Sequence, residues 1–128
     1  MQYEYFYGAQ AEQFSFYRIP KALFTEPNFR ELSTDAKVLY GILLDRMSLS
    51  LKNQWLDAQN KVYIIFTVEE IMDALNCANQ KATRLMVELE KQAGLIERKR
   101  QGLGRPNLIY VKNFAATING ESCEKGDS

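Results

Sequence analysis

The fold is decided by one stretch in the second half of the chain, which reads TVEEIMDALNCANQKATRLMVELEKQAGLIERKRQGLGRPNLIYVKN (residues 67–113). Residues 67–75 carry apolar side chains at helical spacing. Thr67 and Glu70 have the S/T-x-x-E spacing of a capping box, which satisfies two backbone donors at the start of a helix. The stretch therefore opens with a short capped helix, which ends at the tight corner 76–78.

A second helix and a hairpin complete this stretch. Apolar residues again recur at helical spacing over 79–93, and two strands are predicted at 95–101 and 107–113. A glycine-rich turn at 102–106 joins the two strands. Helix, turn, helix and basic β-hairpin is the order of a winged helix-turn-helix, so we predict an α+β winged-helix domain, a fold that presents one helix and one hairpin tip to a duplex.

Further elements are predicted on the N-terminal side of this stretch. Ser33 and Thr34 are good N-cap residues for a buried helix ending near residue 49, in which Gly41 allows close packing. Short strands are predicted at 14–19 and 62–67, and a single helical turn at 21–24. The predicted organisation is an N-terminal extension (1–32), a winged-helix core (33–114) and a flexible tail or linker (115–128).

The N-terminal extension is unusually aromatic. Seven aromatic residues precede residue 18, too many for a solvated tail. They are Tyr3, Tyr5, Phe6, Tyr7, Phe14, Phe16 and Tyr17. Two alternatives stay open: the extension packs on its own domain, or it covers a partner subunit.

Composition excludes several classes of protein. The 128 residues suffice for one domain, and they contain no histidine and only two cysteines. We therefore expect no catalytic site, no metal site and no cofactor, and we expect Cys77 and Cys123 to be reduced thiols. We interpret Glu69, Glu70 and Asp73 as the solvated face of their helix. The chain has no membrane-length apolar run and no signal peptide, so we expect a cytosolic protein.

Charge is distributed unevenly although the net charge is zero. Residues 79–113 hold eight cations and three anions, a local excess of five positive charges, and the remainder of the chain has an excess of five negative charges. A protein with one basic and one acidic side suits oriented docking on phosphates.

The second helix of the stretch is the predicted recognition helix. Its inward face is formed by Ala82, Leu85, Met86, Leu89 and Ala93. In a helix-turn-helix the N-terminal residues of the second helix meet base edges in the major groove. The predicted DNA-contacting residues there are Asn79, Gln80, Lys81, Thr83 and Arg84, whose side chains suit base edges and phosphates. A merely solvated polar face is the alternative.

The hairpin is the predicted wing. Its predicted DNA-contacting residues are Arg98, Lys99, Arg100, Arg105 and Lys112. Gly102 and Gly104 permit positive φ at the tip, where Arg105 is placed for a phosphate or a narrow minor groove. Ile96, Leu108 and Tyr110 are expected to face the core, with Leu95 as a further candidate. The alternative for the charged residues is protection of the strand edges against aggregation.

Several segments together resemble a known family. They are YFYG (5–8), AEQFSFYRIP (11–20), AKVLYG (36–41), LDRMSLS (44–50) and GLGRPNLIYV (102–111). These segments resemble the RepA N-terminal family of theta-type plasmid replication initiator proteins of Gram-positive bacteria. The resemblance covers residues 3–114 and implies a winged-helix domain that binds repeats in the plasmid origin. It also implies a separate C-terminal domain for host replication factors, toward which the tail would lead.

The sequence therefore predicts a non-enzymatic protein that binds double-stranded DNA in the replication origin. Origins with repeated sites favour dimers, so we expect a homodimer in which the aromatic arm or the strand at 62–66 forms the interface. The runner-up within DNA binding is a winged-helix transcription regulator, because the fold serves both tasks. The runner-up in another class is a winged-helix protein–protein interaction module.

Overall fold

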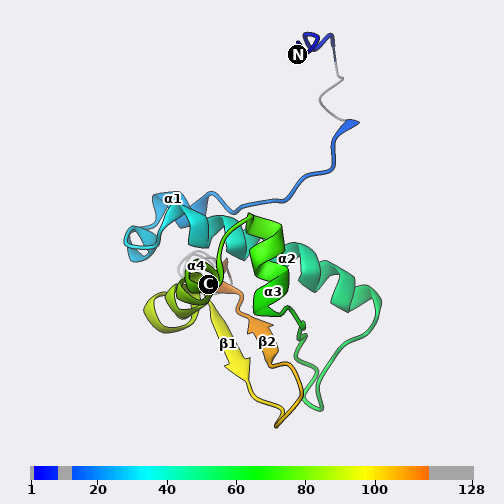
Figure 1. The fold of residues 1–128 in the computed structure, drawn as a ribbon, viewed down its shortest axis with the longest axis vertical. Helices are drawn as coiled ribbons and strands as arrows, with labels where there is room; N and C mark the ends of the chain where they lie inside the picture. Colours follow the sequence, from blue (N-terminus) through cyan, green and yellow to red (C-terminus); the bar gives the residue numbers. More distant parts are fainter. Residues whose placement is uncertain (1, 9–12, 116–128) are drawn as a thin grey trace, which may run out of the picture.

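The computed structural model describes residues 2–8 and 13–115 of the chain. After an extended N-terminal segment the helices come first, and the β-hairpin is the last named element (Figure 1). In chain order the elements are α1 (Ala22–Thr25), the 3₁₀-helix η2 (Pro27–Phe29), α2 (Thr34–Lys52), α3 (Val68–Leu75), α4 (Asn79–Val87), the π-helix η3 (Glu88–Gln92), β1 (Ile96–Lys99) and β2 (Leu108–Val111). The sheet is the antiparallel pair β1–β2. The helix, helix and hairpin order that the sequence predicts is confirmed.

The long helix α2 is the base on which the other elements pack. Its N-cap is Ser33, whose hydroxyl accepts a hydrogen bond from the Ala36 backbone N–H at 3.2 Å. Gly41 is buried against the incoming chain, since a Cβ there would lie 2.9 Å from both the Arg18 carbonyl oxygen and Ile19 Cγ1. The predicted close packing at Gly41 is confirmed, and it fixes where the N-terminal segment crosses α2.

The helix-turn-helix forms from local signals. The predicted capping box is present, because the Thr67 side chain accepts from the Glu70 N–H and the Glu70 carboxylate accepts from the Thr67 N–H. Asn76 ends α3 in the left-handed region (φ 54°), a conformation that Asn tolerates better than most residues. The chain then turns through Ala78 into α4, as predicted.

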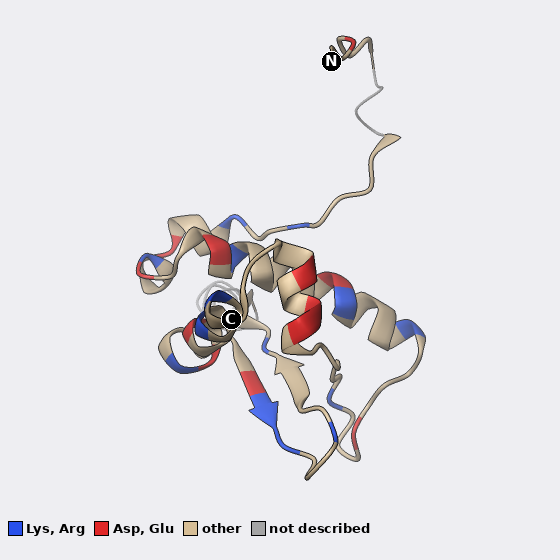
Figure 2. Cartoon of the chain, in the orientation of Figure 1, with Lys and Arg blue, Asp and Glu red and all other residues tan. Residues whose placement is uncertain are grey.

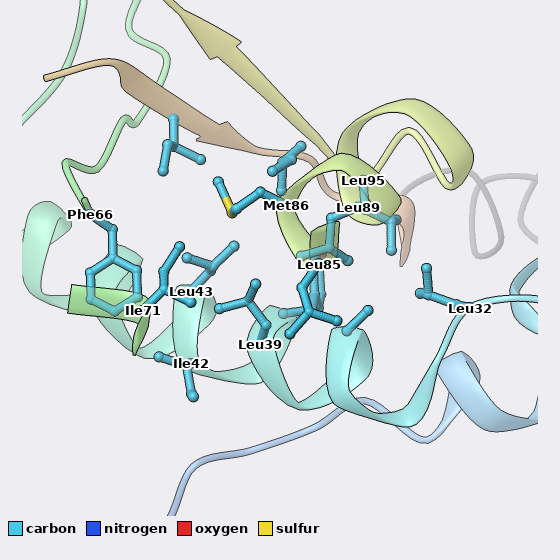
Figure 3. Packing of buried hydrophobic residues seen from close by; sticks show 14 of the residues in the cluster. Leu32, Leu39, Ile42, Leu43, Phe66, Ile71, Leu85, Met86, Leu89 and Leu95 are labelled. Carbon is cyan, nitrogen blue, oxygen red and sulfur yellow. The ribbon is translucent and has the colours of Figure 1, made fainter. Parts of the chain in front are cut away.

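The core joins α2, the helix-turn-helix and the hairpin (Figure 3). Leu39 and Leu43 of α2, Ile71 of α3 and Leu85 of α4 are each fully buried. Ile96 and Ile109 add the inner face of the sheet. Each such side chain contributes roughly 1.5–3 kcal/mol when it is removed from water, so the position of α4 is set by apolar packing.

Two predicted strands are corrected by the structure. Residues 14–19 form no strand, because no segment within the described ranges pairs with them. Residues 62–67 form only the isolated bridges Leu56↔Val62 and Ile64↔Ile109. The predicted helix over 79–93 is also modified, since it changes from α to π at Glu88.

The prediction of which residues of the second hairpin strand face the core is wrong. Ile109 is buried, whereas Leu108 and Tyr110, expected to face the core, are only half-buried. The register pairs Ile96 with Val111 and Arg98 with Ile109, and residues paired across a sheet share a face. Because all four residues of β2 are apolar or aromatic, their order along the strand does not reveal which face is inward.

The N-terminal arm extends away from the helical body (Figure 1). Its aromatic side chains are strongly exposed, from 51% for Phe14 to 84% for Tyr3. The predicted alternative in which these side chains pack on their own domain is thus not found in the structure.

No helix in the described ranges is long and apolar enough to cross a bilayer.

Candidate nucleic-acid interface

The recognition helix α4 turns one face to the core and the other to solvent. Ala82, Leu85 and Met86 are buried, which confirms the predicted inward face at these positions. Four of the five predicted DNA-contacting residues on this helix are exposed: Asn79, Gln80, Thr83 and Arg84. No side chain caps the helix at Ala78, so the backbone donors of its first turn have no capping side chain among the described residues.

Lys81 is the exception among the predicted residues of this helix. Its Nζ lies 2.6 Å from Oδ2 of Asp35, in the first turn of α2. Both side chains remain about half exposed, so this surface pair is weak and its lysine can exchange partners. Arg84, the other cation of α4, forms no ion pair with the described residues.

The wing carries a cluster of exposed cations beyond the paired part of the sheet. Lys99, Arg100 and Arg105 are exposed and form no ion pair within the described part of the chain. Figure 2 shows basic segments following β1 toward the tip, while α3 carries acidic ones. Lys112, at the base of the wing, lies 3.9 Å from the Glu97 carboxylate.

The wing tip has a defined backbone. Gly102 and Gly104 have φ values of 119° and 76°, which confirms the predicted positive φ at both positions. The Arg105 backbone N–H donates to the Gly102 carbonyl at 3.3 Å, and the Gln101 side chain donates to the Pro106 carbonyl at 2.8 Å. These bonds hold Arg105 in the turn.

Arg98 differs from the other wing cations. It lies on the inner face of β1, and its guanidinium binds the Glu90 carboxylate, with Nε 2.8 Å from Oε1. The Arg98 backbone N–H donates to the other carboxylate oxygen at 3.1 Å. Partial burial alone raises the pKa of Glu90, but these hydrogen bonds and the charge of Arg98 outweigh it, and the pKa lies below its usual range.

A second carboxylate, that of Glu88, binds the start of α2 from the other side of η3. Glu88 accepts hydrogen bonds from the backbone N–H and the hydroxyl of Ser33, each at 2.9 Å. Neither of the two carboxylate contacts, that of Glu88 or that of Glu90, is predicted from the sequence. Partners 55 and 8 residues apart leave no periodic signal in a sequence.

Two tyrosine hydroxyls link the hairpin to the rest of the domain. The Tyr40 hydroxyl donates to the Lys112 carbonyl at 2.7 Å, and burial raises the pKa of Tyr40 to about 12. The Tyr110 hydroxyl donates to Asp57 Oδ2 at 3.0 Å on the outer face. The hairpin is thus tied both to α2 and to the loop that follows it.

Carboxylates and cysteines are the other side chains in this region with which a protein can bind metal or carry out catalysis. No group of three or more metal-ligating side chains lies within them. Glu70, one of the three carboxylates on α3, is occupied by the capping box and by Arg46 at 3.1 Å. Cys77 is a free thiol, and Cys123 lies outside the described residues.

Known proteins resemble this chain over most of its length. Residues 15–125 match the model of the family described as replication initiator protein A (RepA) N-terminus. A "41 kDa protein" of Lactobacillus helveticus is 32% identical over 103 residues, which cover 80% of this chain and 28% of that relative. The chain thus spans just over a quarter of the length of this relative.

Three solved structures share the fold. A chain described as "N-Terminal domain of DNA binding protein" is 36% identical, with a TM-score of 0.72 and coverage of 99% of this chain and 98% of that one. "Structure of Rep-DNA complex" gives the same identity and TM-score with 98% coverage of both chains. "Structure of MDR initiator" is 38% identical, with a TM-score of 0.67 and coverage of 93% and 98%. With the winged helix-turn-helix in place, the family match establishes that this chain belongs to the replication initiator protein A N-terminal family.

Proposed function

We propose that this chain is the DNA-binding N-terminal domain of a plasmid replication initiator and binds repeats in the replication origin. The observation that carries the proposal is the pairing of an exposed, uncapped recognition helix with a wing whose outer cations form no ion pair within the described residues. Family membership and the similarity to a Rep–DNA complex support the same interpretation.

The recognition helix would read bases in the major groove. Arg84 can bond guanine O6 and N7 in bidentate fashion, and Gln80 or Asn79 can do the same to adenine N6 and N7. Thr83 adds a hydroxyl and a methyl group on the same exposed face. Lys81 would leave Asp35 for a phosphate, since an exposed ion pair is easily exchanged.

The wing and the helix terminus would supply affinity that depends on salt. The uncapped N-terminus of α4 offers backbone donors and partial positive charge to a phosphate. Lys99, Arg100 and Lys112 would neutralise phosphates, and Arg105 at the tip would reach the backbone or the minor groove. Such contacts fix register and orientation, while base contacts carry the specificity. No catalytic step is part of this function.

Assembly is the second part of the proposal. The exposed aromatic arm is suited to cover a second copy of the chain, and a homodimer would match the symmetry of repeated sites. Light scattering at micromolar concentration tests this, and a monomer there would overturn it. Host replication factors would be bound by a further domain, in keeping with the greater length of the Lactobacillus relative.

Selection from a random duplex library tests the DNA-binding proposal, because the library assumes nothing about the sequence that is bound. The purified chain should enrich one motif after several rounds, and that motif should occur as repeats in the cognate origin. A library that stays random would overturn sequence-specific binding. A motif found only in promoters would favour a transcription regulator, and capture of no duplex would favour a protein-interaction module.

A further inference from the structure

One half-buried carboxylate links the wing to the end of the recognition helix. Glu90 lies in η3, immediately after α4, and its side chain is 16% exposed. It binds Arg98, whose side chain is 25% exposed, through the guanidinium and through the backbone N–H. A single side chain thus spans from the end of the recognition helix to the first strand of the wing.

The sheet register explains why Arg98 faces this carboxylate. Alternate residues of a strand point to opposite faces, so Arg98 shares the inner face with Ile96, while Lys99 points to the other face. The Arg98 side chain therefore lies between η3 and β1, on the inner face of the sheet. A phosphate contact would require this guanidinium to leave a partner that two of its nitrogens reach at 2.8 Å.

The backbone bond adds a second constraint. In the two-stranded sheet β1 is an edge strand, and the N–H of Arg98 is bound by Glu90 Oε2 instead of a neighbouring strand. The same carboxylate thus covers an edge donor and neutralises the cation beside it. Glu88 binds Ser33 on the opposite side of η3, so the π-helix is held between α2 and β1.

We propose that Glu90 is a positioning residue for DNA binding, which fixes the wing relative to the recognition helix through Arg98. The inference rests on the proposed function and deepens it. It also reassigns Arg98, from a predicted DNA contact to a part of the support that directs Lys99, Arg100 and Arg105 toward the duplex.

The sign of the effect separates this role from simple electrostatics. Glu90→Gln removes a negative charge from the basic half of the protein, so charge alone predicts tighter DNA binding. Loss of the wing position predicts the opposite: binding several-fold weaker, with a salt slope lower by about one or more because wing phosphates are lost. Fluorescence anisotropy on the selected duplex measures both.

Glu97→Gln is the matched control. Glu97 is the neighbouring carboxylate on β1, is exposed, and among the ion pairs of the described residues has a single long one, 3.9 Å to Lys112. The control variant should bind as tightly as the unmodified protein or more tightly. Equal weakening by Glu90→Gln and Glu97→Gln would overturn the inference, and so would tighter binding by Glu90→Gln.

Two further variants keep the test independent of folding defects. Arg98→Lys retains the charge but not the planar fork, so it should weaken binding as Glu90→Gln does, whereas a residue that only neutralises a phosphate would tolerate it. Arg105→Ala should weaken binding strongly in the unmodified protein and much less when combined with Glu90→Gln. Additive losses, or no loss from Arg105→Ala, would overturn the inference. Thermal unfolding confirms that each variant is folded at the assay temperature.

Failure of the inference is distinguishable from failure of the proposed function. If the unmodified protein selects and binds a motif but Glu90→Gln binds it equally well, only the positioning role is wrong. If the unmodified protein binds no duplex, the proposed function fails and the positioning role fails with it.

Discussion

The recognition helix and the wing both present cations to solvent, but they are held in place by different means. α4 is fixed by apolar packing, with Leu85 fully buried and Met86 2% exposed. The wing has two strands of four residues each, and every residue from 99 to 107 is exposed. Its base is held by the buried Ile96 and Ile109 and, in addition, by polar contacts of Glu90, Tyr40 and Tyr110. The surface proposed to read bases thus lies on a helix packed into the core, and the surface proposed to contact the DNA backbone lies on a hairpin that projects beyond it.

The largest effect is expected where the helix joins the core. Leu85→Ala should lower the free energy of unfolding by about 2–5 kcal/mol, through lost burial and the cavity left behind. Val87→Ala is the control, because Val87 lies on the same helix and is 41% exposed; it should change stability by about 0.5 kcal/mol or less. Urea unfolding measures both, and similar losses would show that α4 is not held by its buried face.

The next effect concerns base reading by the same helix. Arg84→Ala should cost about 1–3 kcal/mol of binding to the specific duplex and relax specificity at one base pair, if it makes a bidentate guanine contact. Arg30→Ala removes the same charge from an exposed position before α2 and should change binding little. Competition against single-base variants of the site gives the readout. A loss that is equal for specific and scrambled duplexes would contradict base reading by Arg84.

A smaller effect, which does not depend on the DNA sequence, is expected from substitutions in the wing. Lys99→Ala should weaken binding to all sequences alike and lower the salt slope by about one, because Lys99 would neutralise one phosphate. Binding to specific and scrambled duplexes across a salt series measures this. A selective loss on the specific duplex would mean that the wing reads bases, and the contrast between helix and wing would then disappear.

The smallest effect is a pH dependence of the link between wing and helix. Partial burial raises the pKa of Glu90, but the hydrogen bonds from Arg98 outweigh it and lower the pKa, so the ionised form is favoured in the folded state. The stabilisation is present in full above the pKa of an unfolded glutamate, about 4.3, and is lost as the pH falls through the lower folded pKa. The stability difference between the unmodified protein and Glu90→Gln should therefore be constant near neutral pH and shrink below about pH 4.3. Urea unfolding across this range measures it, and a difference that persists in acid would exclude the carboxylate as its source.

Local signals in the sequence predict the helical part of the fold and the exposed face of the site. The caps at Ser33 and Thr67 and the helical spacing of Leu85 and Met86 depend on residues a few positions apart. The positive φ at Gly102 follows equally from the need for a tight turn. The caps, the helical spacing and the glycine turn each depend on residues close together in the sequence, so they can be predicted without knowledge of the tertiary structure.

The remainder depends on contacts between distant segments. The inward position of Ile109 is not predictable from β2 itself, because it is set by pairing with Arg98 and with Ile64. The strand predicted at 62–67 pairs through single bridges, one with Leu56 and one with Ile109, and the positions of these partners are set by tertiary contacts that the segment itself does not encode. The bond between Glu90 and Arg98 requires the turn after η3 to bring β1 back along the helix. The predicted DNA contacts themselves remain predictions.

The most direct test of the account is fluorescence anisotropy of this chain on its origin repeat and on a scrambled duplex, across a salt series. We expect a preference for the repeat of roughly a thousandfold or more, with a steep salt slope that reflects several phosphate contacts. Weak and equal binding to both duplexes would contradict the account, because specificity would then not lie in this recognition helix and wing.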